Sequence, residues 1–379
     1  MKKILLFFSF ILSLITISSC SSKGCDLLIL NWGDYMSDDV IVAFEKEFKV
    51  NVKQVTTDSN ESMYSKILNK QAEYDIVVPS DYMIDQMNEE NLLIKLDYDK
   101  LSNYEDGCFV KELEDLMNSS DCIRYKGTYI PYFWGSLGIM YSKRKYPELE
   151  SIIEEYEWEV LFNHEILPKG CKVGMYNSSR DALAAAELYL GYSLNTTDTN
   201  EIDKCMDLLE KTNFYQWGSD DLKLDVASGK LDVALVYSGD FFDAYYADIE
   251  SGDEKNTENY GIYAPKNHNN VFFDSLVIPN TSTNVDLAHK FINFMLDYDI
   301  SYENSSFIGY CPTLASVYDD FFALEDDFSS IEASNPALII NEEGSWTEVY
   351  KYLGDKIYSY IEKKFTNVIF RWNVITLVL

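Results

Sequence analysis

Short apolar runs alternate with helix-like patterns in the first part of this chain, and this alternation limits the fold more than any other feature. Leu27–Leu30 is an unbroken apolar run, and hydrophobic residues then recur at helical spacing at Val40, Ile41, Phe44 and Phe48. The pattern next predicts a strand over 50–55, a helix over 62–71 and a strand over 74–78. Alternation of this kind predicts an α/β protein whose strands are mostly parallel.

Polar and aromatic residues follow two of these strands. Trp32, Asp34 and Tyr35 come after the first strand, and Ser80 and Tyr82 follow the strand over 74–78. Because ligands of parallel α/β sheets gather at the carboxyl ends of strands, we predict that these residues line a binding site. Taken singly, each residue fits a turn or a packed loop better.

The run from Asn270 to Pro279 combines two aromatics, an aspartate and an apolar stretch. Leu276–Ile278 is typical of a strand covered on both faces, which predicts that Asp274 lies at the edge of that strand beside Phe272. A carboxylate framed by rings suits an organic ammonium, because each ring adds a cation–π attraction of roughly 0.5–2 kcal/mol. A solvated aspartate before an ordinary strand is the alternative.

Two later segments have the same organisation. A strand over 174–176 leads to Ser178, which fits a helix cap, and to Asp181 in the first turn of a helix over 182–189. Asp181 could therefore serve the helix alone, because an acid in the first turn stabilises the helix dipole. A buried strand over 231–236 ends at Tyr237 and Asp240, again at a carboxyl end.

Composition excludes several functions. With 379 residues, 47% of them hydrophobic and 15% aromatic, the chain can bury a core large enough for two lobes. A formal charge of −32 argues against a nucleic-acid partner, whose phosphates require Lys and Arg. The three histidines, His164, His268 and His289, lack the spacing of a zinc site. There is no Gly-rich phosphate loop, and we predict neither a metal nor a cofactor.

The N-terminus has the pattern of an export signal. Lys2 and Lys3 precede an apolar run over 4–17 that is too short to span a bilayer comfortably. Its end, Ile17-Ser18-Ser19-Cys20, resembles the lipobox of bacterial lipoproteins. The resemblance implies cleavage after residue 19, a lipid on Cys20 and an extracytoplasmic protein anchored to the bacterial membrane. A plain signal peptide is the alternative.

The remaining cysteines are Cys25, Cys108, Cys122, Cys171, Cys205 and Cys311. In an exported chain they can pair, and six cysteines allow 15 connectivities. The pair that we favour first is Cys108 with Cys122, which flank a polar segment. No C-x-x-C motif supports a redox or metal role.

Several motifs together resemble one family. N-W-G-D-Y after the first strand and Y-D-I-V-V-P-S-D-Y resemble the substrate-binding lipoproteins of spermidine/putrescine ABC importers. The similarity continues in order through 130–135, 178–181, 236–240, 272–279, 292–296 and 308–313, and covers nearly all of residues 26–360. Each motif is weak alone, but their order and spacing together are specific.

This resemblance implies a two-lobed periplasmic-binding-protein fold of type II character, in which each lobe is a mostly parallel sheet flanked by helices. A polyamine would lie in the cleft between the lobes and pass to the transmembrane permease subunits of the transporter, with no bond made or broken. The implied walls of the cleft are Trp32, Tyr35, Ser80, Tyr82, Tyr237 and Phe272. The implied carboxylates are Asp34, Asp181, Asp240 and Asp274. We expect a monomer that is not an enzyme.

The predicted organisation has five parts. Residues 1–19 are the signal peptide, and residues 20–25 are a lipidated tether. Lobe 1 comprises 26–136 plus 272–300, and lobe 2 comprises 137–271 plus 301–365. The tail over 366–379 extends beyond the usual end of the family, and it fits an added strand, a partner-binding segment or an altered reading frame equally well.

Several questions stay open at this point. Some spermidine-type relatives have an acid where Ser178 stands, and tryptophans where Tyr237 and Phe272 stand, so spermidine and putrescine are both possible ligands. Another organic cation in the same fold is a second hypothesis. A carboxylate-pair glycosidase is a third, and it would need two aspartates about 5–9.5 Å apart across a sugar bond.

Overall fold

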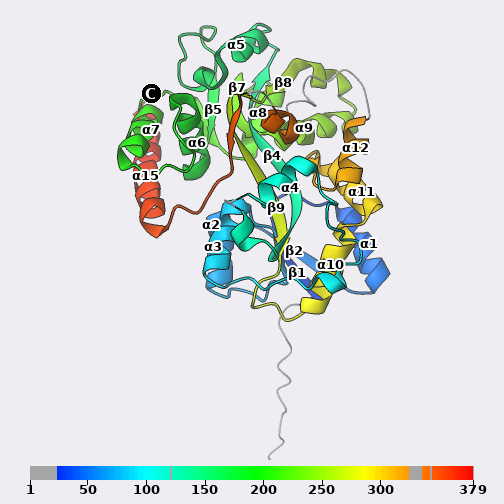
Figure 1. The fold of residues 1–379 in the computed structure, drawn as a ribbon. Coiled ribbons are helices and arrows are strands. Elements are labelled where there is room, and N and C mark those ends of the chain that lie inside the picture. The colour runs from blue at the N-terminus through cyan, green and yellow to red at the C-terminus, as the bar shows by residue number, and fades with distance from the viewer. Residues whose placement is uncertain (1–23, 120–121, 324–334, 342–343, 379) are drawn as a thin grey trace, which may run out of the picture.

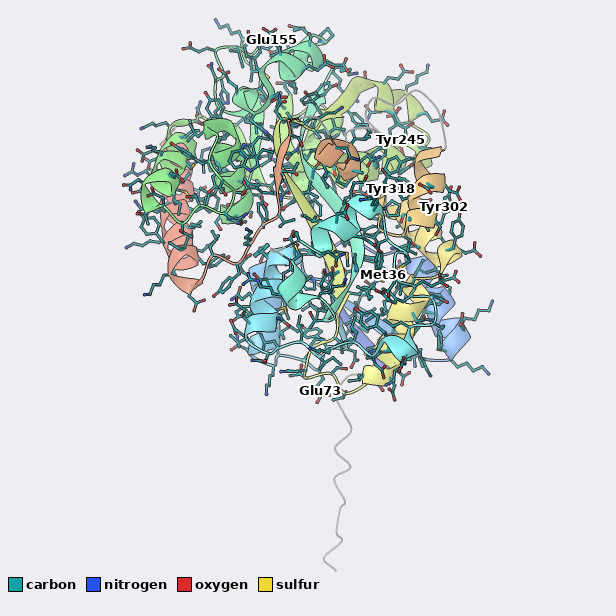
Figure 2. The ribbon with its side chains drawn as sticks, in the orientation of Figure 1. Met36, Glu73, Glu155, Tyr245, Tyr302 and Tyr318 are labelled. Atoms are coloured by element: carbon teal, nitrogen blue, oxygen red, sulfur yellow. The ribbon has the colours of Figure 1, made fainter. Side chains whose placement is uncertain are left out.

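The computed structural model describes residues 24–119, 122–323, 335–341 and 344–378. The predicted signal peptide and the lipid-bearing Cys20 lie outside the described residues. Two α/β lobes lie one above the other, joined by long central strands (Figure 1). Acidic side chains such as Glu73 and Glu155 project from the two far ends of the molecule (Figure 2).

The lower lobe of Figure 1 is formed mainly by the N-terminal part of the chain. Its elements are β1 (Leu27–Asn31), α1 (Asp38–Phe48), β2 (Val52–Thr56), α2 (Asn60–Leu68), β3 (Ile76–Val77), α3 (Asp81–Glu89), η1 (Tyr98–Lys100), α4 (Lys111–Met117), η2 (Ile123–Tyr125) and α10 (Val285–Met295). The strands β2, β1 and β3 run parallel, as predicted. All of β1 is buried, because a central parallel strand is covered by helices on both faces.

The upper lobe repeats this organisation. Its elements are α5 (Leu149–Tyr156), η3 (Glu157–Leu161), β5 (Val173–Tyr176), α6 (Ser179–Leu190), α7 (Thr199–Lys211), β6 (Gln216–Gly218), α8 (Asp221–Ala227), β7 (Val233–Tyr237), α9 (Ser238–Glu250), η4 (Glu254–Asn259) and β8 (Tyr260–Tyr263). The strands β6, β5 and β7 run parallel. The cap predicted at Ser178 is present, because its side chain accepts a hydrogen bond from the backbone N–H of Asp181.

Two long buried strands connect the lobes. In β4 (Tyr129–Ser142), residues 129–136 pair antiparallel with β9 (His268–Val277), whereas residues 137–141 pair antiparallel with β7. The strand order therefore runs without a break as β2-β1-β3-β9-β4-β7-β5-β6, with β8 also on β4. The motif over 130–135 lies inside β4.

One local prediction on β9 is wrong. Asp274 does not lie at a strand edge, because β9 continues on both sides of it and Asp274 is the register partner of Phe133. The whole strand is buried, including Asn269 and Asn270. A strand covered on both faces shows no polar–apolar alternation, so a polar residue does not mark its end.

The C-terminal part of the chain returns to both lobes. Its elements are α11 (Tyr298–Ile308), β10 (Cys311–Pro312), α12 (Ala315–Ala323), α14 (Pro336–Asn341), β11 (Trp346–Glu348) and α15 (Asp355–Val378). The strand β10 pairs with β4 at Trp134 and Phe133, in the same sheet as β1. The lobe boundaries stay a prediction, although this pairing attaches part of 301–365 to the first sheet.

The tail after residue 366 is not an added strand. It forms the last turns of α15, which lies along α7 (Figure 1). Trp372 donates a hydrogen bond from Nε1 to the carbonyl of Phe214 at 3.0 Å, and the ring of Phe365 packs against Trp217. None of the helices formed by the described residues combines the length and apolar character needed to cross a membrane.

The predicted Cys108–Cys122 disulfide is also wrong. Both residues are thiols in the structure, with Cys122 buried and Cys108 half-buried. Spacing in the sequence could not test this pairing, because a disulfide requires a specific distance and orientation of the two Cβ atoms.

Candidate functional site

Asp274 lies on β9, one of the two long strands that connect the lobes. Its Oδ2 accepts a hydrogen bond from the hydroxyl of Tyr35 at 2.6 Å, and Ser80 forms an isolated β-bridge with it. The opposite strand β4 has a bulge between Pro131 and Phe133, directly across from Asp274. Bulges re-aim side chains next to functional sites, which fits the position of this carboxylate.

Asp274 is only 5% exposed, and its Oδ1 has no hydrogen-bond partner among the described residues. Burial raises the pKa of Asp274 from 3.8 to about 6, although hydrogen bonds from Ser80 and Tyr35 lower it in part. A buried carboxylate with an unsatisfied oxygen is costly unless a cation or a donor arrives. This group is therefore prepared to receive a positively charged ligand.

Asp181, at the start of α6, forms a second carboxylate centre. It accepts hydrogen bonds from the hydroxyls of Tyr237, at 2.6 Å, and Tyr350, at 3.4 Å. Burial raises the pKa of Asp181, and hydrogen bonds from Tyr237 and Ser178 oppose that rise. The guanidinium of Arg180 lies 4.3 Å over the ring of Tyr350. The Asp181 carboxylate therefore also accepts hydrogen bonds from residues outside its own helix.

Asp240, in the first turn of α9, forms the third centre. Its Oδ2 accepts the Tyr176 hydroxyl at 2.9 Å and the Tyr237 backbone N–H at 3.0 Å. Its Oδ1 accepts the Tyr310 hydroxyl at 3.2 Å and the Lys223 ammonium at 3.4 Å. Asp240 is 4% exposed, so these four donors replace most of its contact with water.

Aromatic rings connect the three carboxylates. Tyr310, which donates to Asp240, packs edge-on against Tyr35 with centroids 5.1 Å apart, and Tyr35 donates to Asp274. Tyr237, which donates to Asp181, packs against Phe272 at 5.0 Å. Phe272 also lies 6.5 Å from Tyr310. We call the three aspartates and these four rings, Tyr35, Tyr237, Phe272 and Tyr310, the carboxylate–aromatic cluster.

Two glycines allow this close packing. A Cβ atom on Gly239 would lie 2.1 Å from the ring of Tyr310. A Cβ atom on Gly135 would lie 2.8 Å from the ring of Phe272. Both distances are far below van der Waals contact, so a side chain at either position would displace a ring of the cluster.

The chemistry of the carboxylate–aromatic cluster favours organic cations. Carboxylates bind ammonium groups through charge-assisted hydrogen bonds, and ring faces attract the cations and cover methylene groups. In the part of the chain that the structure describes, no group of three or more His, Cys, Asp or Glu side chains is arranged to hold a metal ion.

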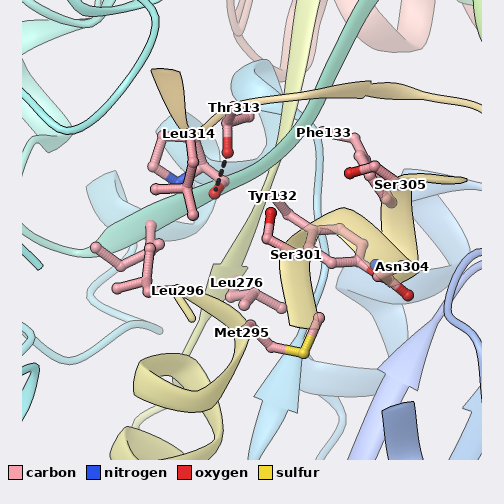
Figure 3. Close-up of a pocket in the computed structure, with 12 residues that line it drawn as sticks. Tyr132, Phe133, Leu276, Met295, Leu296, Ser301, Asn304, Ser305, Thr313 and Leu314 are labelled. Atoms are coloured by element: carbon pink, nitrogen blue, oxygen red, sulfur yellow. Dashed lines mark hydrogen bonds between the residues drawn. The ribbon is translucent and has the colours of Figure 1, made fainter. Parts of the chain in front are cut away.

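A small cavity near the cluster is not the ligand site. It lies between β4, β9 and the helices α10 and α11, and is lined by residues such as Tyr132, Met295 and Ser305 (Figure 3). Its volume is about 10 Å³. That is room for about one water molecule and far too little for an organic solute.

Comparison with known proteins identifies the family. Residues 39–335 match the family described as bacterial extracellular solute-binding protein. The chain belongs to the bacterial extracellular solute-binding proteins. This solute-binding protein is 32% identical to the putrescine-binding periplasmic protein SpuD of Pseudomonas aeruginosa (strain UCBPP-PA14) over 282 residues, which cover 73% of this chain and 75% of SpuD.

Two further relatives support this placement. The solute-binding protein is 30% identical to the spermidine/putrescine-binding periplasmic protein of Escherichia coli (strain K12), over 76% of this chain and 78% of the relative. Its fold matches the solved substrate-binding protein PotD of a spermidine/putrescine ABC transporter from Streptococcus pneumoniae, with a TM-score of 0.69 and 29% identity. That match covers 91% of this chain and 99% of PotD. The predicted two-lobed fold is confirmed.

The structure brings most of the predicted site residues together. Six of them belong to the carboxylate–aromatic cluster: Tyr35, Asp181, Tyr237, Asp240, Phe272 and Asp274. Ser80 is adjacent to Asp274. Tyr82 packs against Tyr350 and donates to Glu61 at 2.8 Å, so it lies on the Asp181 side. Ligand binding by each residue stays a prediction.

Two predicted residues lie apart from these contacts. Trp32 is half-buried, and its Nε1 has no hydrogen-bond partner among the described residues. Asp34 is exposed, and its backbone has a φ of 44°. Its charge helps to raise the pKa of Asp220 in the other lobe, although burial is the main cause of that rise.

Sequence reasoning missed Tyr176, Tyr310, Lys223 and Glu61. Tyr176 ends β5, so the rule applied to the other strand ends would have found it. Tyr310 lies inside a matched motif, but nothing local distinguished it from its neighbours. Lys223 and Glu61 are charged residues on short helices, α8 and α2, where a charge usually means a solvated face.

Proposed function

We propose that this solute-binding protein is the extracytoplasmic component of an ABC importer and that it captures a polyamine in the carboxylate–aromatic cluster. The observation that carries the proposal is the buried carboxylate of Asp274 within that cluster, whose Oδ1 has no hydrogen-bond partner among the described residues. The relatives support it, because proteins with related sequences are named for binding putrescine and spermidine.

The physical chemistry of a polyamine fits this arrangement. A polyamine carries ammonium groups separated by methylenes, so it requires carboxylates at intervals with flat apolar surfaces between them. Tyrosine hydroxyls fix both carboxylates, one at Asp274 and two at Asp181, and leave capacity for a further donor. Tyr35, Tyr237 and Phe272 supply rings with little conformational freedom to lose.

The location belongs to the same proposal. A chain of this family acts outside the cytoplasm, and a lipid on Cys20 would hold it at the membrane beside the permease. Cys20 is outside the described residues, so the anchor rests on the lipobox-like sequence. We also propose that the protein works as a monomer, in which the two lobes alone complete the site.

Calorimetric titration tests the proposal. A delipidated chain without residues 1–20 is titrated with putrescine, spermidine and spermine, and with iron, a sugar and an amino acid as controls. We expect binding to at least one polyamine at micromolar affinity or better, about −8 kcal/mol. No detectable binding of any of the three polyamines would contradict the proposal.

One observation favours a second candidate, a ligand that carries a carboxylate as well as an ammonium. Arg180 is 5% exposed, and its Nη1 has no hydrogen-bond partner among the described residues. This guanidinium lies over the ring of Tyr350, whose hydroxyl donates to Asp181. It suits a carboxylate of the ligand, because Arg binds such groups through paired hydrogen bonds. Titration with an ω-amino acid and with the diamine of equal length separates the two candidates.

A further inference from the structure

A lysine of the protein itself already forms an ion pair with one of the three carboxylates of the cluster. The Nζ atom of Lys223, on α8, lies 3.4 Å from Oδ1 of Asp240 and 2.7 Å from Oδ2 of Asp243. The Lys223 side chain is 13% exposed, far less than most lysines. Lys223 therefore forms an inward-facing ion pair, and it is not a solvated surface charge.

The three aspartates of the cluster differ in this respect. Asp240 has the Lys223 ammonium and three other donors. Asp181 and Asp274 form no ion pair within 4 Å with any described residue; their strongest contacts are tyrosine hydroxyls. Only Asp240 has both its charge and its hydrogen-bonding capacity satisfied before a ligand arrives.

Lys223 stays charged in this position. Burial alone would lower the pKa of Lys223, but the nearby carboxylates of Asp240 and Asp243 raise it on balance. The same ammonium lowers the pKa of Asp220, where burial is the larger influence and raises it. Lys223 thus neutralises part of an acidic group formed by Asp220, Asp240 and Asp243.

We propose that Lys223 is a resident ammonium that fills the Asp240 position of the cluster and so makes this protein selective for a diamine over a triamine. The inference rests on the proposed function. The two ammonium groups of a diamine can pair with Asp274 and Asp181. A third ammonium would meet Lys223 instead of a free carboxylate, and like charges repel.

The test compares the affinities for putrescine and spermidine in matched variants. In the wild-type protein we expect tighter binding of putrescine. Lys223→Met vacates Asp240, so spermidine should gain about tenfold or more relative to putrescine, because a charge-assisted hydrogen bond becomes available. Lys223→Arg keeps the charge and should keep the wild-type ratio.

Lys230→Met is the control for net charge. Lys230 is 58% exposed and pairs with Asp225 on the surface of the same lobe, so its loss should leave the ratio unchanged. An unchanged ratio in Lys223→Met would overturn the inference, and so would a wild-type preference for spermidine. If the wild-type protein binds neither polyamine, the proposed function itself fails, which is a different result.

A double variant protects the test against misfolding. Lys223→Met leaves Asp240 buried without its counter-charge, which destabilises proteins. Lys223→Met/Asp240→Asn removes both charges, so folding should be retained. This variant removes the repelling ammonium but vacates no carboxylate, so spermidine should gain less relative to putrescine than it does in Lys223→Met. A gain as large as that in Lys223→Met would contradict a role for the Asp240 charge.

Discussion

Replacing Asp274 by Asn tests the centre of the proposed site. Asn has almost the same shape as Asp but has no charge. It can still accept the hydrogen bond from Tyr35, which is 2.6 Å long with Asp274. A ligand ammonium buried beside it would have no counter-charge, which costs about 3–5 kcal/mol. The affinity for the polyamine should therefore fall by about two to four orders of magnitude.

The same variant should make the ligand-free protein more stable. Burial raises the pKa of Asp274 from 3.8 to about 6, so the folded protein binds this proton more tightly than the unfolded chain does. The resulting stabilisation is present below pH 3.8 and is lost as the pH rises through about 6. A pKa difference of this size corresponds to about 3 kcal/mol, and Asn removes the cost of ionisation at neutral pH.

Two assays at pH 5 and pH 7.5 measure both effects. Urea unfolding without ligand should show Asp274→Asn to be more stable at pH 7.5, by up to about 3 kcal/mol. In calorimetry the wild type should bind about tenfold more weakly for each pH unit below the pKa of Asp274. Asp286→Asn, at a side chain that is 81% exposed, is the control for net charge. Polyamine binding within about threefold of the wild type would refute a role for this carboxylate.

Three other variants test the surroundings of the site. Gly239→Ala should displace the ring of Tyr310 and cost about 1–3 kcal/mol of unfolding free energy, and an unchanged urea midpoint would contradict this packing. Glu187→Gln removes a buried acid whose pKa is raised by burial to about 8. The stability that neutral Glu187 confers is lost as the pH rises through about 8. In urea unfolding, the gain in stability from Gln should therefore be larger at pH 8 than at pH 5, and equal gains at the two pH values would argue against the raised pKa. Ser178→Ala removes the cap at the N–H of Asp181 and should cost about 0.5–2 kcal/mol, which thermal unfolding can detect; no change in stability would count against the cap.

The local patterns of the sequence predicted the parallel parts of both sheets well. The helix patterns at Val40–Phe44 and after Ser178 correspond to α1 and α6, because the hydrophobic period of a helix repeats within a few residues. At α6 the cap at Ser178 is a local signal as well. The ends of the predicted strands located part of the site, because the apolar runs that predict strands are also local patterns. Tyr35 and Asp240 both follow strands that the apolar runs identified.

Properties that depend on distant contacts were not predictable in this way. The length of β9 is set by pairing with β4 and not by its own pattern, so Asp274 was placed at an edge that does not exist. The tail after residue 366 is helical because Trp372 and its neighbours pack on the second lobe. Lys223 looks like an ordinary surface lysine until α8 and α9 place it beside Asp240.

Asp274 lies on β9, a strand that the two lobes have in common through β4. A rotation of one lobe relative to the other turns about such shared strands, so the residues on them travel least. An ammonium held by Asp274 would be fixed at the pivot, while Asp181 and Asp240 move with the second lobe. Opening for delivery could then detach the far end of the ligand first and leave the near end held until the permease competes for it.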